Sequence, residues 1–244
     1  MKKSEVCDLI KQVGIIPSIR VASGDDAHHA AEAIESGGIP LVEITMSVPG
    51  AVDLIAHLVR FHPKMLVGAG TVFDAETARR CIDAGASYLT GPCLDLDLMN
   101  YAAKSEVAVL SGALTPTEVV AAWRAGSDFV KIFPCALVGG AKYIKALTTS
   151  LPQIPLIAAG GVNQQTAADF ILSGALAIGV GTELIPEEAI EKHQWKRIKE
   201  LSRRFSGFVK EARELVAKRR ENAVVHEFSG SEKCEPHEHT GKGH

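Results

Sequence analysis

Several features are scarce or missing in this sequence, and each absence narrows what it can encode. Aromatic residues make up only 5% of the 244 residues, so a core must consist mainly of Ala, Val, Ile and Leu, as in parallel α/β folds. The longest apolar runs are strand-sized, and the N-terminus lacks the apolar centre of a signal peptide, which argues against a membrane protein. A net charge of −3 gives no reason to expect nucleic acid or a membrane surface as a partner.

Cysteine is also used sparingly. The chain has five cysteines, an odd number, widely spaced and with no CxxC pair, which is typical of reduced thiols in a cytoplasmic protein. Residues 221–244 contain almost no apolar side chain and are predicted to form a disordered polar tail. Cys234, His237 and His239 in this tail are metal-binding residue types, but their spacing fits no closed structural site, so we expect no metal requirement.

A regular rhythm runs through residues 1–220, which we interpret as a single domain. A short amphipathic helix is predicted over residues 3–13, and a long Lys-, Arg- and Glu-rich helical pattern runs from Glu187 to about Arg220. Between them, segments with helical spacing alternate with eight strand-like runs: Ile15–Arg20, Leu41–Thr45, Met65–Ala69, Ser87–Thr90, Val107–Leu110, Asp128–Ile132, Pro155–Ala158 and Ala177–Val180.

Glycine and capping residues punctuate this rhythm. Gly37-Gly38, Gly85, Gly126 and Gly174 each stand where a helix would end before the next strand, and the candidate N-caps are Asp74, Thr115 and Asn163. Eight such units predict an α/β fold, a (β/α)8 TIM barrel with an extra N-terminal helix. The competing open, doubly wound sheet is disfavoured because no GxGxxG follows the first strand.

One lysine is out of place in this pattern. Lys131 lies near the end of an apolar strand, among Val130, Ile132 and Phe133, where burying an ammonium group costs several kcal/mol unless it is paired or neutral. Desolvation lowers the pKa of an amine, and only the free amine attacks a carbonyl carbon to form a Schiff base. The alternative is a lysine that extends from the strand end into water. The polar residues at the ends of the other strands favour the interpretation of Lys131 as a nucleophile.

Polar residues at the carboxyl ends of barrel strands carry the chemistry of this fold. The first strands end in Arg20, in Glu43-Ile44-Thr45 and before Thr71, which together offer a cation, a carboxylate and hydroxyls. Glu43 is either an acid/base group or a hydrogen-bonded structural carboxylate. A carboxylate near Lys131 would raise the lysine pKa while burial lowers it, and Arg20 would either neutralise Glu43 or bind a substrate carboxylate.

Glycine turns follow the last two strands. Gly160-Gly161 and Gly179-Val180-Gly181-Thr182 are predicted at helix starts, where backbone N–H groups and the helix dipole favour an anion. Because phosphate sites after strands 7 and 8 recur in this fold, phosphate is favoured over turns that merely need glycine.

Five motifs together resemble the 2-keto-3-deoxy-6-phosphogluconate (KDPG) and 4-hydroxy-2-oxoglutarate (KHG) aldolase family. They are residues 42–45 with Val48-Pro49, 68–72, 130–134, 160–163 and 179–181. The resemblance implies a homotrimer and a class I aldolase without cofactor or metal, which cleaves a keto-acid phosphate to pyruvate and glyceraldehyde 3-phosphate, or KHG to pyruvate and glyoxylate. It makes Lys131 the Schiff-base lysine, Glu43 the general acid/base and Thr71 a carboxylate ligand. It also makes the glycine turns with Thr182 the phosphate site, and it includes Arg20, Thr45 and Phe133 among the substrate-binding residues.

The chain departs from the family pattern at a few positions. Ser47 replaces an arginine found in many members, with Arg20 as its substitute, and Ala159 replaces a threonine before the Gly-Gly turn. Gly91-Pro92-Cys93 and Ser111-Gly112 also differ from the usual pattern. These changes leave open an aldolase for a related acid, such as the phosphogalactonate, or an inactive phosphosugar-binding barrel. A metal-dependent epimerase is disfavoured because His28, His29, His57, His62 and His193 fall on expected outer helices.

Overall fold

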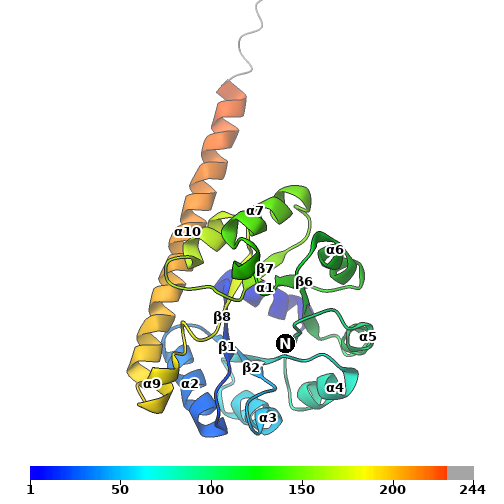
Figure 1. Cartoon of the computed structure of the whole chain (residues 1–244), viewed down its shortest axis with the longest axis vertical. Coiled ribbons are helices and arrows are strands. Elements are labelled where there is room, and N and C mark those ends of the chain that lie inside the picture. Colours follow the sequence, from blue (N-terminus) through cyan, green and yellow to red (C-terminus); the bar gives the residue numbers. More distant parts are fainter. Residues whose placement is uncertain (230–244) are drawn as a thin grey trace, which may run out of the picture.

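The computed structural model describes residues 1–229 of the 244-residue chain (Figure 1). The cysteine- and histidine-containing segment with Cys234, His237 and His239 lies outside the described residues. Within residues 1–229, no helix is both long enough and apolar enough to cross a bilayer.

Eight parallel strands close into a barrel in chain order, with β8 paired to β1, which confirms the predicted (β/α)8 fold. The strands are β1 (Ile15–Ile19), β2 (Leu41–Thr45), β3 (Leu66–Gly70), β4 (Tyr88–Thr90), β5 (Ala108–Ala113), β6 (Phe129–Ile132), β7 (Leu156–Ala159) and β8 (Ala177–Val180). Every residue of β2, β3, β4, β5 and β7 is buried, as expected for a parallel sheet covered by helices.

Helices form an outer layer around the strands (Figure 1). The helices of the described residues are α1 (Lys3–Val13), which does not belong to this layer, and α2 (Gly24–Ser36), α3 (Ala51–Phe61), α4 (Ala75–Asp83), α5 (Leu96–Lys104), α6 (Pro116–Arg124), the 3-10 helix η1 (Ala136–Val138), α7 (Ala141–Ser150), α8 (Ala167–Leu172), α9 (Glu187–Glu191) and α10 (Trp195–Ser229).

The extra N-terminal helix α1 lies across the amino end of the barrel, where it packs against β5 and β8. Lys3 forms an ion pair of 3.0 Å with Asp128, just before β6. At the other end of α1, the Arg213 guanidinium of α10 donates to the backbone carbonyl oxygens of Lys11, Gln12 and Leu176. The closed amino end leaves the carboxyl end of the barrel for a binding site.

The predicted punctuation is confirmed at most positions. Four of the glycines after helices adopt positive φ, where a side chain would be strained: Gly38, Gly85, Gly126 and Gly174. Asp74 and Thr115 cap α4 and α6, because their side-chain oxygens accept the backbone N–H groups of Thr77 and Glu118.

Three predicted boundaries differ from the structure by more than one residue. Asn163 is not the N-cap of α8, which begins four residues later at Ala167; its side chain instead accepts the N–H groups of Gln165 and Thr166 within a preceding turn. The strand β5 continues to Ala113, past the predicted end at Leu110. The last helix, α10, extends to Ser229, so residues 221–229 continue the helix beyond the predicted domain boundary at residue 220 and project from the barrel (Figure 1).

Candidate active site

The carboxyl ends of the strands surround a cavity of about 530 Å³. Nine of the ten predicted site residues line it: Arg20, Glu43, Thr71, Lys131, Phe133, Gly160, Gly161, Gly181 and Thr182. The barrel therefore brings together residues from six strands or the loops that follow them, which is the usual arrangement of a site in this fold.

Lys131 occupies the penultimate position of β6 and is half-buried between fully buried neighbours. Lys131 lines the cavity, and its Nζ donates a hydrogen bond of 3.2 Å to Thr90 Oγ1 at the end of β4. The Nζ also lies 5.8 Å from the centre of the Phe133 ring. The lysine is thus held inside the barrel by a neutral hydroxyl and an aromatic face.

Glu43 lies in the middle of β2 and is only 4% exposed. Its carboxylate accepts two hydrogen bonds, from Ser18 Oγ at 2.7 Å and from Thr90 Oγ1 at 2.8 Å. Two hydroxyl donors offset much of the cost of burying this charge. Because Thr90 also accepts from Lys131, its hydroxyl joins the amine to the carboxylate.

Tyr88 on β4 packs beside the Glu43 carboxylate. Its hydroxyl donates to the Val42 carbonyl at 2.8 Å, next to Glu43 in β2. Complete burial raises the pKa of the Tyr88 phenol well above its ordinary value, and the charge of Glu43 adds to that rise. Tyr88 therefore remains protonated and acts as a fixed packing element beside Glu43.

Arg20 and Thr71 form a second polar group on the cavity wall. The guanidinium of Arg20 donates to Thr71 Oγ1 at 3.1 Å. Thr71 has a φ of 61°, a left-handed conformation that is uncommon for threonine and places it directly after β3. Among the described residues Arg20 forms no ion pair with Glu43, so its cationic group is oriented toward the cavity and not toward that carboxylate.

The glycine turns after β7 and β8 line the cavity on another side. Gly160 and Gly161 have φ values of 83° and 82°, and a Cβ on Gly161 would lie 2.3 Å from the Cβ of Ala136. The predicted helix starts are wrong here, because α8 and α9 begin only at Ala167 and Glu187 and are short. An anion at these turns would therefore meet backbone N–H groups and not a helix dipole.

Thr45 is the predicted site residue that does not line the cavity. It is fully buried, and its hydroxyl donates to the Ile19 carbonyl at 3.0 Å and contacts Ser47 Oγ at 2.8 Å. Thr45 lies on β2 and Ile19 ends β1, so this hydrogen bond joins the two strands.

Two residues of the site were missed from sequence, namely Ser18 and Thr90. Both had a detectable signal. Ser18 is the polar residue of β1 that pairs in register with Glu43, and Thr90 ends β4. Side chains from alternate strands share a layer inside such barrels, so β2, β4 and β6 are expected to bring Glu43, Thr90 and Lys131 together.

The positions that depart from the family pattern differ in whether they line the cavity, are exposed or are buried. Ala159 lines the cavity at the end of β7, whereas Ser47 is exposed and bonded to Thr45. Ser111 is buried, and its hydroxyl reaches the Cys93 carbonyl at 3.4 Å. Of these positions, Ala159 alters the cavity surface most directly. None of the described histidines lines the cavity, so its donor set does not resemble a His-containing metal centre.

Comparison with known proteins gives a consistent result. A family model for KDPG and KHG aldolase matches residues 6–201. The 2-dehydro-3-deoxy-phosphogluconate aldolase of Pseudomonas aeruginosa is 30% identical over 203 residues, which cover 83% of this chain and 92% of that protein. The KHG/KDPG aldolase of Escherichia coli K12 is 30% identical over 190 residues, covering 78% and 89% of the two chains.

Solved structures agree. The KDPG aldolase of Legionella pneumophila, with pyruvate captured as a covalent carbinolamine, superposes with a TM-score of 0.75 at 30% identity and covers 81% of this chain and 96% of its own. A structure described as native KDPGal gives a TM-score of 0.75 at 29% identity, covering 82% and 96%.

Proposed function

This chain belongs to the family of KDPG and KHG aldolases, and on that basis we propose that it cleaves KDPG to pyruvate and glyceraldehyde 3-phosphate through an imine at Lys131. The observation that carries the proposal is the hydrogen-bonded chain from Lys131 through the buried Thr90 to Glu43, in which Lys131 and Glu43 line the cavity. It provides a nucleophilic amine and a proton-transferring carboxylate in one site.

The first half of the reaction belongs to Lys131. Its neutral Nζ attacks the C2 carbonyl of the substrate to give a carbinolamine, which loses water to form the protonated imine. The imine withdraws electrons from C3 and replaces the electron sink that a metal ion would supply, so the proposal includes no cofactor. Support comes from the Legionella relative, in which pyruvate is held as the carbinolamine.

Glu43 moves the protons, either directly or through one water. It accepts the proton of the C4 hydroxyl; the O–H electrons form the aldehyde carbonyl, the C3–C4 bond breaks and its electrons enter the imine as an enamine. After the aldehyde leaves, C3 of the enamine takes a proton back. One water then hydrolyses the imine and releases pyruvate and the free Lys131. This water balances the one released when the imine formed.

The remaining cavity residues bind the two charged ends of the substrate. Arg20 and Thr71 provide a cation and a hydroxyl for the C1 carboxylate. The turns at Gly160-Gly161 and Gly181-Thr182 provide close backbone approach for the phosphate. We include a homotrimer in this proposal because of the family to which the chain belongs. The free thiols of the described residues support a cytoplasmic location.

A second candidate is the galactonate counterpart of KDPG, favoured by the 29% identity to the KDPGal structure. The two substrates differ only in the configuration at C4, one of the two carbons of the cleaved C3–C4 bond. Comparing kcat/KM for both in one preparation distinguishes them: a higher value for the galactonate compound would replace KDPG as the assigned substrate while leaving the imine mechanism intact.

The test of the mechanism is reductive trapping. Incubation with pyruvate and borohydride is expected to add one reduced pyruvyl group at Lys131, located by peptide mass spectrometry. Lys131→Ala should abolish both the label and cleavage, whereas the exposed Lys142→Ala on α7 should retain both. Labelling at other lysines only would refute the assignment of Lys131, whereas no labelling at all would support a barrel that binds phosphosugars without imine chemistry.

A further inference from the structure

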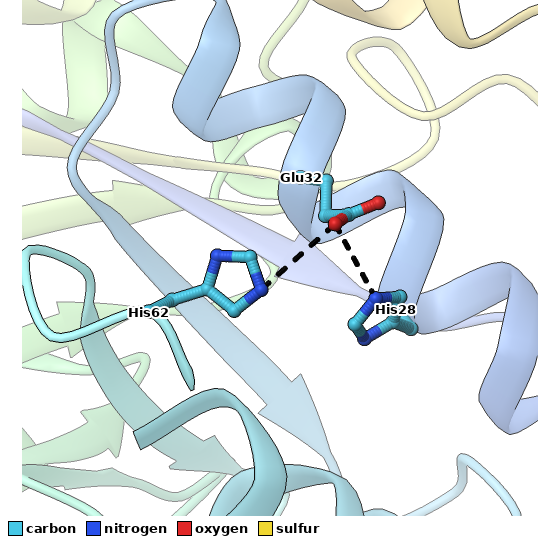
Figure 2. Close-up of side chains that lie close together, drawn as sticks. All are labelled: His28, Glu32 and His62. Atoms are coloured by element: carbon cyan, nitrogen blue, oxygen red, sulfur yellow. Dashed lines mark ion pairs between the residues drawn. The ribbon is translucent and has the colours of Figure 1, made fainter. Parts of the chain in front are cut away.

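A cluster of histidines lies on the outer helical layer, away from the cavity. His28 and Glu32 stand one turn apart on α2, and His62 follows the last residue of α3 (Figure 2). The three side chains converge on one point between the two helices, and none of them lines the barrel cavity. We call these three residues the outer cluster.

The distances in the outer cluster are too long for good hydrogen bonds. Glu32 Oε1 lies 3.5 Å from His28 Nε2 and 3.9 Å from His62 Nε2, beyond the usual range of N–H···O bonds. A tetrahedral ion bound at about 2.1 Å by nitrogen and oxygen holds its ligands about 3.4 Å apart. The three ligand atoms already lie within 4.8 Å of one another, so small side-chain rotations reach that geometry.

A neighbouring carboxylate orients one of the ligands. Glu35 Oε2 lies 3.0 Å from His62 Nδ1, and in the tautomer that carries its proton on Nδ1 the carboxylate accepts this hydrogen bond while Nε2 can bind an ion. A carboxylate on the second nitrogen of a metal-binding histidine is a recurrent feature of zinc sites, and it fixes the tautomer and raises ligand basicity.

The surroundings leave room for a fourth ligand. The side chain of Glu32 is 45% exposed, so water can reach an ion held by the three side chains. Water can therefore complete a tetrahedral set.

We propose that the outer cluster binds one divalent transition-metal ion of the imidazole-preferring class, Zn²⁺ first among them. Two imidazoles and one carboxylate select such ions over Ca²⁺ and Mg²⁺, which prefer all-oxygen sites. The ion joins α2 to the end of α3, the two helices that follow the strands carrying Ser18 and Glu43. Its role is structural, because the site lies outside the cavity, and it is independent of the aldolase proposal.

Titration of the full-length protein with Zn²⁺ tests this assignment. One site is expected whose affinity falls at least tenfold in His28→Gln, Glu32→Gln and His62→Gln. Glu35→Gln, which removes only the orienting carboxylate, should weaken binding by about 10- to 100-fold. A Zn²⁺ concentration of about 100 times Kd should raise the Tm by roughly 5–10 °C, and these variants should lose that shift.

Matched variants separate the outer cluster from other ligands. His29 stacks on Trp195 and His193 packs against the same ring, so His29→Gln and His193→Gln should bind Zn²⁺ like the parent. The triple change Cys234→Ser, His237→Ala, His239→Ala should likewise retain the site. The proposal is overturned if the outer-cluster variants bind as tightly as the parent, or if the site disappears only in the tail variant. A sulfur-to-metal charge-transfer band with Co²⁺ would also overturn it, because the outer cluster contains no thiolate.

Discussion

The methyl group of Ala159 lies on the cavity wall at the end of β7, where the family pattern has a threonine hydroxyl. Only 7% of this residue is exposed, and the neighbouring Gly179 contributes no side chain on that side. Under the proposed function, the cavity therefore lacks one hydrogen-bond donor for the substrate carboxylate, while Arg20 and Thr71 remain. The glycine turns that we propose to bind the phosphate are unchanged.

Ala159→Thr is expected to raise kcat/KM for both KDPG and KHG. A hydrogen bond to a charged group contributes about 1.5–3 kcal/mol, which corresponds to roughly tenfold to a hundredfold. In the parent, KDPG should be the better substrate because its phosphate reaches the intact turns. Steady-state kinetics with both substrates provide the measurement. Ala159→Val has the shape of threonine without its hydroxyl, so an equal gain in that variant would rule out the hydrogen bond.

Thr90 is expected to affect the rate although it is fully buried and does not line the cavity. Thr90→Val keeps the side-chain shape but removes the hydroxyl that joins Lys131 to Glu43. Loss of this bond to a charged group should lower kcat by about tenfold to a hundredfold, with a smaller change in KM. The comparison variant is Thr45→Val, whose hydroxyl bonds to Ile19 outside the cavity. Similar kcat losses in both would show a general packing effect.

At the level of elements, β3 explains how a barrel this small accommodates Glu43 and Tyr88. A Cβ at Gly68 would lie 2.2 Å from the Tyr88 ring, and one at Gly70 would lie 2.2 Å from Glu43 Oε1. The two glycines of the Leu66–Gly70 strand thus provide the space for the side chains of β2 and β4.

Gly70→Ala should therefore displace the Glu43 carboxylate and reduce kcat by more than tenfold, with a lower Tm. Activity assays and thermal unfolding are the measurements. Gly207→Ala is the matched change, since a Cβ there meets no atom within 4 Å and alanine favours the helix of α10. A Gly70→Ala enzyme with parent-like kcat would mean that Glu43 tolerates displacement or has no role in proton transfer.

The same elements show what sequence could and could not predict. Apolar runs located all eight strands, and glycines at positive φ marked the helix ends before β2, β4, β6 and β8, because both signals are local. The end of β5 was missed since Ser111-Gly112 resembles a turn; glycine is needed there because a Cβ would lie 2.2 Å from the Pro92 backbone. Likewise, the hydroxyl of Thr45 is captured by a carbonyl on β1, a contact that depends on strand register and not on local sequence.

At the scale of the whole molecule, buried thiols link stability to pH. Cys81 and Cys135 are fully buried, and burial raises the pKa of each thiol from 9.0 to about 11. The unfolded chain therefore loses these protons first. Their contribution to stability is complete below about pH 9 and is lost as the pH rises toward 11.

The free energy of unfolding, measured by denaturant titration, is expected to fall between pH 9 and 11. The double variant Cys81→Ala, Cys135→Ala should show a shallower fall, although its stability at about pH 8 is lower because of the cavities left in the core. Cys93→Ala, at an exposed position, should keep the parent slope. If the double variant falls as steeply as the parent, other groups cause the alkaline loss.

The closed ring of strands also determines what would happen if the chain were produced as two separate fragments. Three strands lie between Lys131 on β6 and Glu43 on β2 in either direction around the barrel. A cut in the connection between β4 and β5 leaves Ser18, Glu43 and Thr90 in one piece and Lys131 in the other. Neither fragment alone would be active under the proposed mechanism. Aldolase activity would therefore appear only when both fragments are present and associate.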